Sequence, residues 1–146
     1  MYMDDEFLES NDLDWFSSYK DGLLAHFATG GGCEMPEEVR RFIDNYEIIY
    51  DYFHSLGVST DIEIIEENLP LFLTQEQRER YLQSFINIAC KGICSYDIRR
   101  DDSCYKLIAK PKVCLRYDQL PEEVRKIIYI LPKEIMSGSV VVKNLE

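Results

Sequence analysis

The sequence lacks two features that would direct it to a membrane. No apolar run reaches the ~18–20 residues that a membrane-spanning helix needs, and the acidic start MYMDDEFLESNDLD is unlike a basic secretory signal. Basic side chains are also few, because 16 lysines and arginines stand against 27 acidic residues, for a formal charge of -11. Such a surface repels phosphate, which argues against nucleic-acid binding. We therefore expect a cytoplasmic protein with neither a nucleic-acid nor a membrane partner.

Residues and motifs of common catalytic and metal sites are scarce as well. The chain has only two histidines, and it contains no G-x-S-x-G elbow, H-E-x-x-H pair or P-loop. Its five cysteines are an odd number at irregular spacing, which is typical of buried thiols in a reducing compartment and not of zinc knuckles. We therefore expect no catalytic residue, no metal and no cofactor.

The remaining composition is that of one globular domain. Hydrophobic residues make up 46% of 146 residues, enough for a single core. Charge is unevenly spread, because residues 1–98 hold 20 acidic and 6 basic side chains, whereas residues 99–146 hold 7 and 10. The first residues are acidic with few apolar side chains. We therefore expect an acidic N-terminal tail or short helix over residues 1–13 and a single domain over residues 14–146.

A hairpin is predicted near the start of this domain. Two β-favouring runs, Trp15–Tyr19 and Leu23–Phe27, flank Asp21-Gly22, a pair that favours a tight turn. A two-residue loop at this pair would pair Ser17 with His26. In this register one face of the hairpin would carry Trp15, Ser17, Tyr19, Leu24, His26 and Ala28.

Apolar spacing and helix-start signals predict the other elements. We expect one helix from Pro36 to Gly57, a second from the Thr74 capping box to Gly92, and a short one that begins after Leu120 and ends at Pro132. The segment Asp61–Leu73 fits either a short helix, which is slightly preferred, or a strand. Further strands are expected at Ile93–Arg99, Cys104–Ala109, Val113–Tyr117 and Ser139–Lys143. These elements predict an α+β fold with a small, mainly antiparallel sheet, two longer helices and one short helix.

One short sequence occurs twice. Met35–Ile43 and Leu120–Ile128 share five consecutive residue types around Pro-Glu-Glu-Val. Either an ancient duplication or the general usefulness of this pattern as a helix start explains the repeat.

Candidate binding residues lie in the hairpin and the glycine-rich loop that follows it. Gly30–Gly32 precede a helix, but Glu34 and Glu37 would repel an anion there and no lysine follows. In the predicted register Ser17 and His26 are neighbours, yet nothing else of a nucleophilic site is present. We expect contacts to a ligand or partner from Trp15, Ser17, Tyr19, His26, Thr29 and Gly31.

The opening of the chain carries a resemblance. Asp14-Trp-Phe16, Asp21-Gly22, the run from Ala25 to Gly31 and the following Pro36 resemble an uncharacterised family of small acidic bacterial proteins. These resemble, in size and acidity, the immunity proteins that neutralise toxins of competing bacteria. The resemblance brings no established activity, and no catalytic residue is carried over from it.

Two functions of different classes follow. The first is a non-catalytic, cytoplasmic protein-binding module of the immunity type, whose acidic, tyrosine-rich surface meets a basic toxin or enzyme. The alternative is a small enzyme or ligand-binding protein with a pocket where His26, Trp15 and Thr29 converge beside Gly30–Gly32. A homodimer through an exposed strand edge is a further hypothesis.

Overall fold

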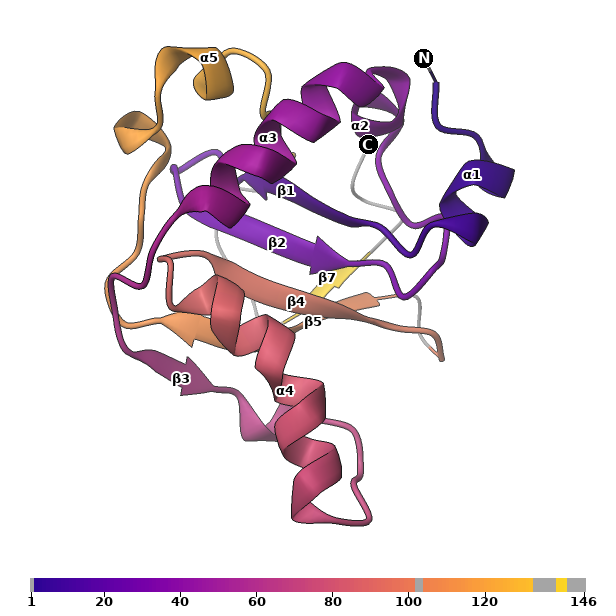
Figure 1. Ribbon diagram of the computed structural model, residues 1–146, viewed down its shortest axis with the longest axis vertical. Helices are drawn as coiled ribbons and strands as arrows, with labels where there is room; N and C mark the ends of the chain where they lie inside the picture. Colours follow the sequence, from indigo (N-terminus) through magenta and orange to yellow (C-terminus); the bar gives the residue numbers. More distant parts are fainter. Residues whose placement is uncertain (1, 102–103, 133–138, 142–146) are drawn as a thin grey trace.

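The chain forms one mixed β-sheet with helices packed on it (Figure 1). The computed structural model describes residues 2–101, 104–132 and 139–141. The strands are β1 (Asp14–Ser18), β2 (Leu24–Ala28), β3 (Ile62–Ile64), β4 (Cys94–Arg99), β5 (Cys104–Pro111), β6 (Tyr129–Ile130) and β7 (Ser139–Val141). Their order is β3-β5-β4-β2-β1-β6, and β7 pairs with the other half of β5. The α+β class is confirmed, but the sheet is mixed, because β2–β4 and β1–β6 are parallel.

Two of the helices are long, as predicted. The helices are α1 (Asp5–Ser10), α2 (Glu37–Arg41), α3 (Ile43–Ser55), α4 (Gln75–Ala89) and α5 (Glu122–Arg125), with 3-10 turns η1 (Glu66–Asn68) and η2 (Tyr117–Gln119). Helix α4 begins at the predicted cap, where Thr74 Oγ1 accepts a hydrogen bond from Gln77 N at 3.1 Å. The helix predicted from Pro36 is interrupted at Phe42, whose extended backbone (φ -129°, ψ 87°) separates α2 from α3.

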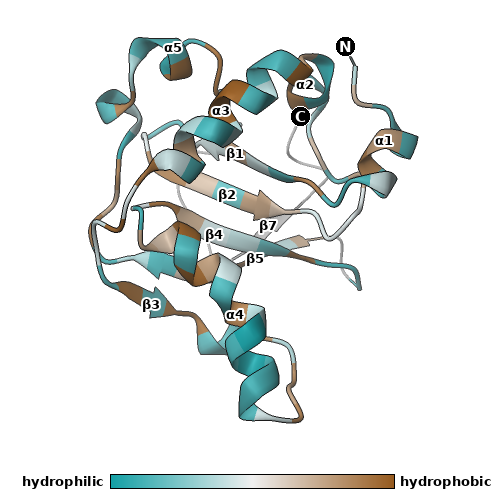
Figure 2. Cartoon of the chain, in the orientation of Figure 1, coloured by the Kyte–Doolittle hydropathy of each residue, from teal (hydrophilic) through white to brown (hydrophobic). Residues whose placement is uncertain are grey.

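Helices α3 and α4 cover one face of the sheet (Figure 1). Phe53 of α3 stacks on Phe16 of β1 with ring centroids 4.7 Å apart. Phe85 of α4 packs against the His26 ring of β2. In Figure 2 the hydrophilic residues of α4 are concentrated in the lower part of the helix, which extends beyond the strands. The hydrophobic stripes predicted for both long helices therefore face the sheet.

The opposite face is lined by aromatic side chains. Trp15 stacks on Phe27 at 4.3 Å, and its indole Nε1 donates a hydrogen bond to the Tyr105 hydroxyl at 3.2 Å. The Tyr19 and Tyr96 hydroxyls lie 2.6 Å apart. Because β2 and β4 separate β1 from β5, the sheet must curl for Trp15 to reach Tyr105. This closed aromatic layer satisfies its own polar atoms inside the core.

The predicted register of the first hairpin is wrong by one residue. Phe16 lies opposite His26 and Ser17 opposite Ala25, so Ser17 is not the neighbour of His26. The loop has three residues, because Tyr19 N donates to Leu23 O at 2.8 Å and Gly22 takes a positive φ of 96°. A three-residue loop with glycine in this left-handed conformation is a common hairpin connection. The shift exchanges faces, which puts Trp15 and His26 on opposite sides of the sheet.

The N-terminal segment belongs to the domain and is not a tail. Helix α1 confirms the alternative of a short helix, but Met3 and Leu8 are fully buried in the aromatic layer's core. Arg40 holds the segment, because its Nε donates to Met3 O at 2.8 Å and its guanidinium pairs with Asp5 at 2.6 Å. Apolar side chains on both sides of residue 13 are therefore buried in the same core.

The last predicted helix is a single turn. Helix α5 ends at Arg125, and Tyr129–Ile130 then pair with β1 as a parallel strand. Ile127 N and Ile128 N still donate to Val124 O at 3.1 and 2.9 Å, and the pairing of Tyr129 with Ser17 of β1 then replaces the helical bonds. Ser139–Val141 form the predicted last strand, whose residues 142–143 lie outside the described chain.

Two other segments differ from the predictions. Val113–Tyr117 form no strand, because their backbone bonds go to two turns: Leu115 N donates to Gly92 O and Tyr117 N to Gly22 O, both at 2.9 Å. The segment Asp61–Leu73 contains both predicted structures, β3 followed by η1. The preference for helix is wrong over Ile62–Ile64, where pairing with β5 decides the structure.

Candidate functional site

Most of the predicted contact residues are core residues. The structure leaves Gly31 partly exposed but buries the other five almost completely: Trp15, Ser17, Tyr19, His26 and Thr29. Since Trp15 and His26 lie on opposite faces of the sheet, they do not meet at one pocket. Thr29 instead ties its loop to β1, because its hydroxyl donates to Leu13 O at 2.6 Å.

His26 forms hydrogen bonds to two side chains, and neither is the Ser17 side chain that the predicted register placed beside it. Its Nδ1 is 2.7 Å from Ser95 Oγ, and its Nε2 is 2.8 Å from Asp14 Oδ2. Strand β4 supplies Ser95 because β2 and β4 pair in parallel with His26 opposite Ser95. A carboxylate at Nε2 requires a proton on that nitrogen, which leaves Nδ1 of the neutral ring to accept from the serine hydroxyl.

These three hydrogen-bonded side chains are of the types found in a hydrolase triad, but their exposure to solvent does not fit that role. Ser95 is completely buried, whereas the Asp14 side chain is 32% exposed. A nucleophile must reach its substrate, and the orienting carboxylate is normally the enclosed member. The observed order is the reverse, so this group of side chains satisfies a buried histidine and does not present a nucleophile.

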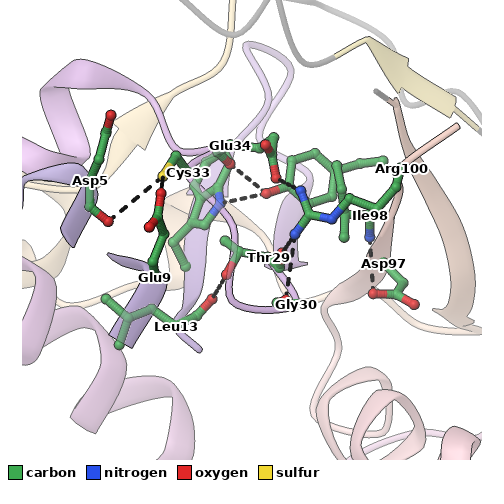
Figure 3. A network of polar contacts seen from close by, with 12 residues as sticks. Asp5, Glu9, Leu13, Thr29, Gly30, Cys33, Glu34, Asp97, Ile98 and Arg100 are labelled. Carbon is green, nitrogen blue, oxygen red and sulfur yellow. Dashed lines mark hydrogen bonds and ion pairs between the residues drawn. The ribbon is translucent and has the colours of Figure 1, made fainter. Parts of the chain in front are cut away.

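The glycine-rich loop binds a cation from its own chain (Figure 3). The Arg100 guanidinium donates to the backbone carbonyls of Thr29 and Gly30 and pairs with Glu34. A Cβ on Gly32 would clash with the Arg100 guanidinium and the Glu34 carboxylate in these positions, so a larger residue there would require these two side chains to move. Carbonyl oxygens turned toward a guanidinium are the reverse of the amide cradle that binds phosphate.

The cysteines do not gather at a metal site. Cys33 contacts Glu9 and the Asp5 carbonyl, and burial raises the pKa of its thiol (Figure 3). Burial also raises the pKa of the Cys94 thiol to about 12, with Cys114 beside it. Within residues 2–101, 104–132 and 139–141, no three His, Cys, Asp or Glu side chains are close enough to share a metal ion.

A group of acidic side chains without ion pairs among the described residues lies along α3 and in the turn before β1. Asp44, Glu47 and Asp51 follow three- and four-residue spacing on α3, and Asp12 lies opposite them. None of the ion pairs among the described residues includes any of these four acids. At the end of α3, burial and Lys91 lower the pKa of His54, so this imidazole adds no compensating positive charge at neutral pH.

A cavity, the acidic pocket, lies between these acidic side chains and two tyrosines of α3, Tyr46 and Tyr50. It is lined by Asp12, Leu13, Asp14, Tyr46, Glu47, Tyr50 and Asp51 and holds about 380 Å³. The Tyr46 hydroxyl donates to the Asp14 carbonyl at 2.6 Å, and the Tyr46 and Tyr50 rings stack with centroids 6.0 Å apart. Carboxylates beside aromatic faces are the two features that attract an organic cation.

A second cavity, the apolar groove, also has Tyr46 in its lining. It holds about 460 Å³ and is lined by Phe16, Glu38, Val39, Phe42, Asn45, Tyr46, Ile49 and residues 126–130. Phe42 and Ile130 remain 48% and 42% exposed. Neither this groove nor the acidic pocket includes His26 or residues 30–32 in its lining.

The sequence analysis predicted the residue types of the acidic pocket but not the location of either cavity. The acidic excess and the tyrosine content of the region are visible in the sequence. The four-residue spacing of Glu47 and Asp51 beside Tyr46 and Tyr50 was a signal for one helical face. That Asp12 and Ile130 would join this face depends on contacts between distant segments.

Comparison with protein-family models, curated protein sequences and solved structures finds no match to this chain. In the described part of the chain no helix has both the length and the apolar character needed to cross a bilayer. The geometry of the chain itself is therefore the basis for a functional proposal.

Proposed function

We propose that this chain is a non-catalytic, cytoplasmic protein-binding module of the immunity type, which covers a basic surface of a partner protein with the acidic face of α3. The observation that carries the proposal is the acidic pocket, where Asp12, Glu47 and Asp51 surround Tyr46 and Tyr50 without an ion-pair partner among the described residues. Lysine or arginine side chains of a partner supply that missing charge.

The chemistry of the pocket suits a protein cation better than a free inorganic one. Tyr50 is partly exposed beside these acids, although its ring also stacks on His54 with centroids 4.0 Å apart. Its large amphipathic side chain gives an organic cation contact area that an inorganic ion cannot use. Tyrosine and arginine are also the residue types that most often dominate binding energy at protein interfaces. The overall charge of -11 adds long-range attraction, which speeds association with a basic partner.

The test measures binding to the product of the neighbouring gene, the natural candidate partner of an immunity-type protein. Isothermal titration calorimetry at low salt is expected to show a complex that weakens steeply toward about 1 M salt, where the Debye length is roughly 3 Å. The double variant Glu47→Gln/Asp51→Asn is expected to weaken it about tenfold or more at low salt.

A matched control separates the acidic face from total charge. Glu67→Gln/Glu79→Gln removes the same number of charges from η1 and α4, away from α3 (Figure 1). This control is expected to change affinity only slightly. No complex at low salt, or equal losses from the two double variants, would refute the proposal.

A further inference from the structure

The two cavities beside α3 share one wall. Tyr46 lines both the acidic pocket and the apolar groove, and its hydroxyl is fixed by the hydrogen bond to the Asp14 carbonyl. Burial raises the pKa of the Tyr46 phenol, with the negative charge of Asp14 adding to the effect, so the hydroxyl stays protonated and bonded. Tyr46 is thus a fixed side chain shared by a site for a cation and a site for an apolar group.

The groove has the composition of a binding site for an apolar anchor. Its floor is formed by Phe16 and Ile49, which are 3% and 8% exposed, and Phe42 and Ile130 rise beside it. Three side chains, Glu38, Asn45 and Lys126, supply its polar lining. Nine of its twelve lining residues are apolar or aromatic, while polar atoms contribute at least as much of the exposed lining, so this cavity of about 460 Å³ offers both apolar contact and hydrogen-bond partners to a ligand.

From this shared wall we propose that the groove binds an apolar side chain of the same basic partner segment that places a lysine or arginine in the acidic pocket. The inference rests on the proposed function and deepens it by naming the recognised pattern. In an extended segment, residues i and i+2 point to the same side, about 6.8 Å apart. An apolar residue and a cationic residue two positions apart would therefore straddle Tyr46.

Charge selects this occupant over others. A second copy that used this same face would place its acids against Glu47 and Asp51, and its overall charge of -11 adds long-range repulsion. Anionic lipid is disfavoured for the same reason. A small uncharged ligand could fill the groove, but it would leave the exposed parts of Phe42, Ile130 and the acids uncovered. A basic segment with an apolar anchor covers all of these surfaces together.

Two blocked peptides test the pattern by nuclear magnetic resonance titration of the full chain. The anchor peptide is Arg-Ser-Leu-Ser-Arg, and the control peptide is Arg-Ser-Ser-Ser-Arg. The anchor peptide is expected to shift backbone signals of Phe42, Ile49 and Ile130 as well as Tyr50 and Asp51. The control peptide is expected to shift only the last two and to bind about fivefold or more weakly.

Two isoleucines of similar exposure provide matched variants. Ile130→Ala removes part of the groove, whereas Ile48→Ala removes an isoleucine of α3 that is 47% exposed and lines neither cavity. Ile130→Ala is expected to weaken the anchor peptide about fivefold and leave the control peptide unchanged. Ile48→Ala is expected to change neither affinity.

The other outcomes are distinguishable. If both peptides shift only Tyr50 and Asp51 and bind equally, the groove inference fails while the proposed function stands. If neither peptide affects α3 at low salt, both fail. Groove signals that move with protein concentration in the absence of peptide would assign the groove to a second copy and overturn the inference.

Discussion

His26 of β2 and Ser95 of β4 face each other across a parallel strand pair, with Nδ1 and Oγ 2.7 Å apart. Both side chains are buried, and Asp14 binds the other ring nitrogen. The hydroxyl therefore satisfies a nitrogen that water cannot reach. Its role in the structure is stability, and this role gives the first of four predictions.

Removing the Ser95 hydroxyl should destabilise the protein, whereas removing another buried serine hydroxyl should not. Ser95→Ala leaves His26 Nδ1 without a partner, at an expected cost of about 1–3 kcal/mol. Ser17 is equally buried, but its Oγ is the one buried side-chain polar atom of the described residues that has no hydrogen-bond partner. Ser17→Ala should thus be neutral or stabilising. Urea unfolding of both variants gives the comparison, and equal losses would contradict it.

The pH dependence of stability should reveal Asp97. Burial raises the pKa of its carboxyl above the ordinary 3.8, although the Tyr81 hydroxyl donates to it at 2.6 Å. The folded state then binds the proton more tightly than the unfolded state, so this group lowers stability as pH rises above 3.8 through the folded-state pKa. Relative to the wild type, Asp97→Asn should therefore gain stability as pH rises above 3.8, in addition to a pH-independent cost of losing one of the two oxygens that accept from Tyr81 and from Ile98 N.

A second variant checks the sign of that effect. Tyr81→Phe removes a donor that lowers the pKa of Asp97, so this pKa should rise further and the loss of stability should extend to higher pH. Urea unfolding across the acidic range measures both variants against the wild type. A stability difference between Asp97→Asn and wild type that does not change with pH would be inconsistent with this account.

Two glycines with positive φ should differ sharply in their tolerance of alanine. Gly92 has a φ of 101°, and a Cβ there would lie 2.7 Å from the Leu115 backbone nitrogen. Gly31 has a φ of 79°, but its Cβ would meet no atom within 4 Å. Gly31→Ala should cost about 1–2 kcal/mol from backbone conformation alone. Gly92→Ala should cost clearly more, and thermal melts that rank the two in the opposite order would contradict the steric explanation.

Thiol reactivity should follow burial along the chain. Cys94 is 1% exposed and its raised pKa of about 12 keeps it a thiol near neutral pH, while Cys104 is 8% exposed. The other three, Cys33, Cys90 and Cys114, are partly exposed. An aromatic disulfide reagent should label these three in the folded protein and the two buried ones only on unfolding. Mass spectrometry of the labelled peptides identifies each site, and rapid labelling of Cys94 in the folded state would refute the prediction.

Short-range signals in the sequence were sufficient for several elements. The repeated Pro-Glu-Glu-Val start forms a helical turn in both places, since Val39 N and Val124 N each donate to the carbonyl of their preceding proline at 3.0 Å. Thr74 caps α4 as predicted, and Asp21-Gly22 lie in the first hairpin's loop. These features depend on residues no more than four positions apart.

Long-range contacts were beyond such signals. The one-residue error in the hairpin register came from choosing a two-residue loop, and it moved His26 to the face of Trp15. The helix was predicted to continue beyond Arg125, but Tyr129 instead pairs in parallel with Ser17 of β1. Ser17 is more than a hundred positions away in the sequence. For the candidate site, the sequence predicted an acidic, tyrosine-rich surface, but none of its six predicted contact residues lines either cavity beside α3.

The sequence by itself determined the α+β class, the starts of the helices and the excess of negative charge, because composition and neighbouring residues suffice for these. Only the tertiary structure decided that Ser95 would form a hydrogen bond with His26 and that Tyr46 would line both the acidic pocket and the apolar groove. The physical reason is that strand pairing and the packing of α3 bring together side chains from distant segments. The free energy of those contacts depends on the whole fold and not on any local pattern.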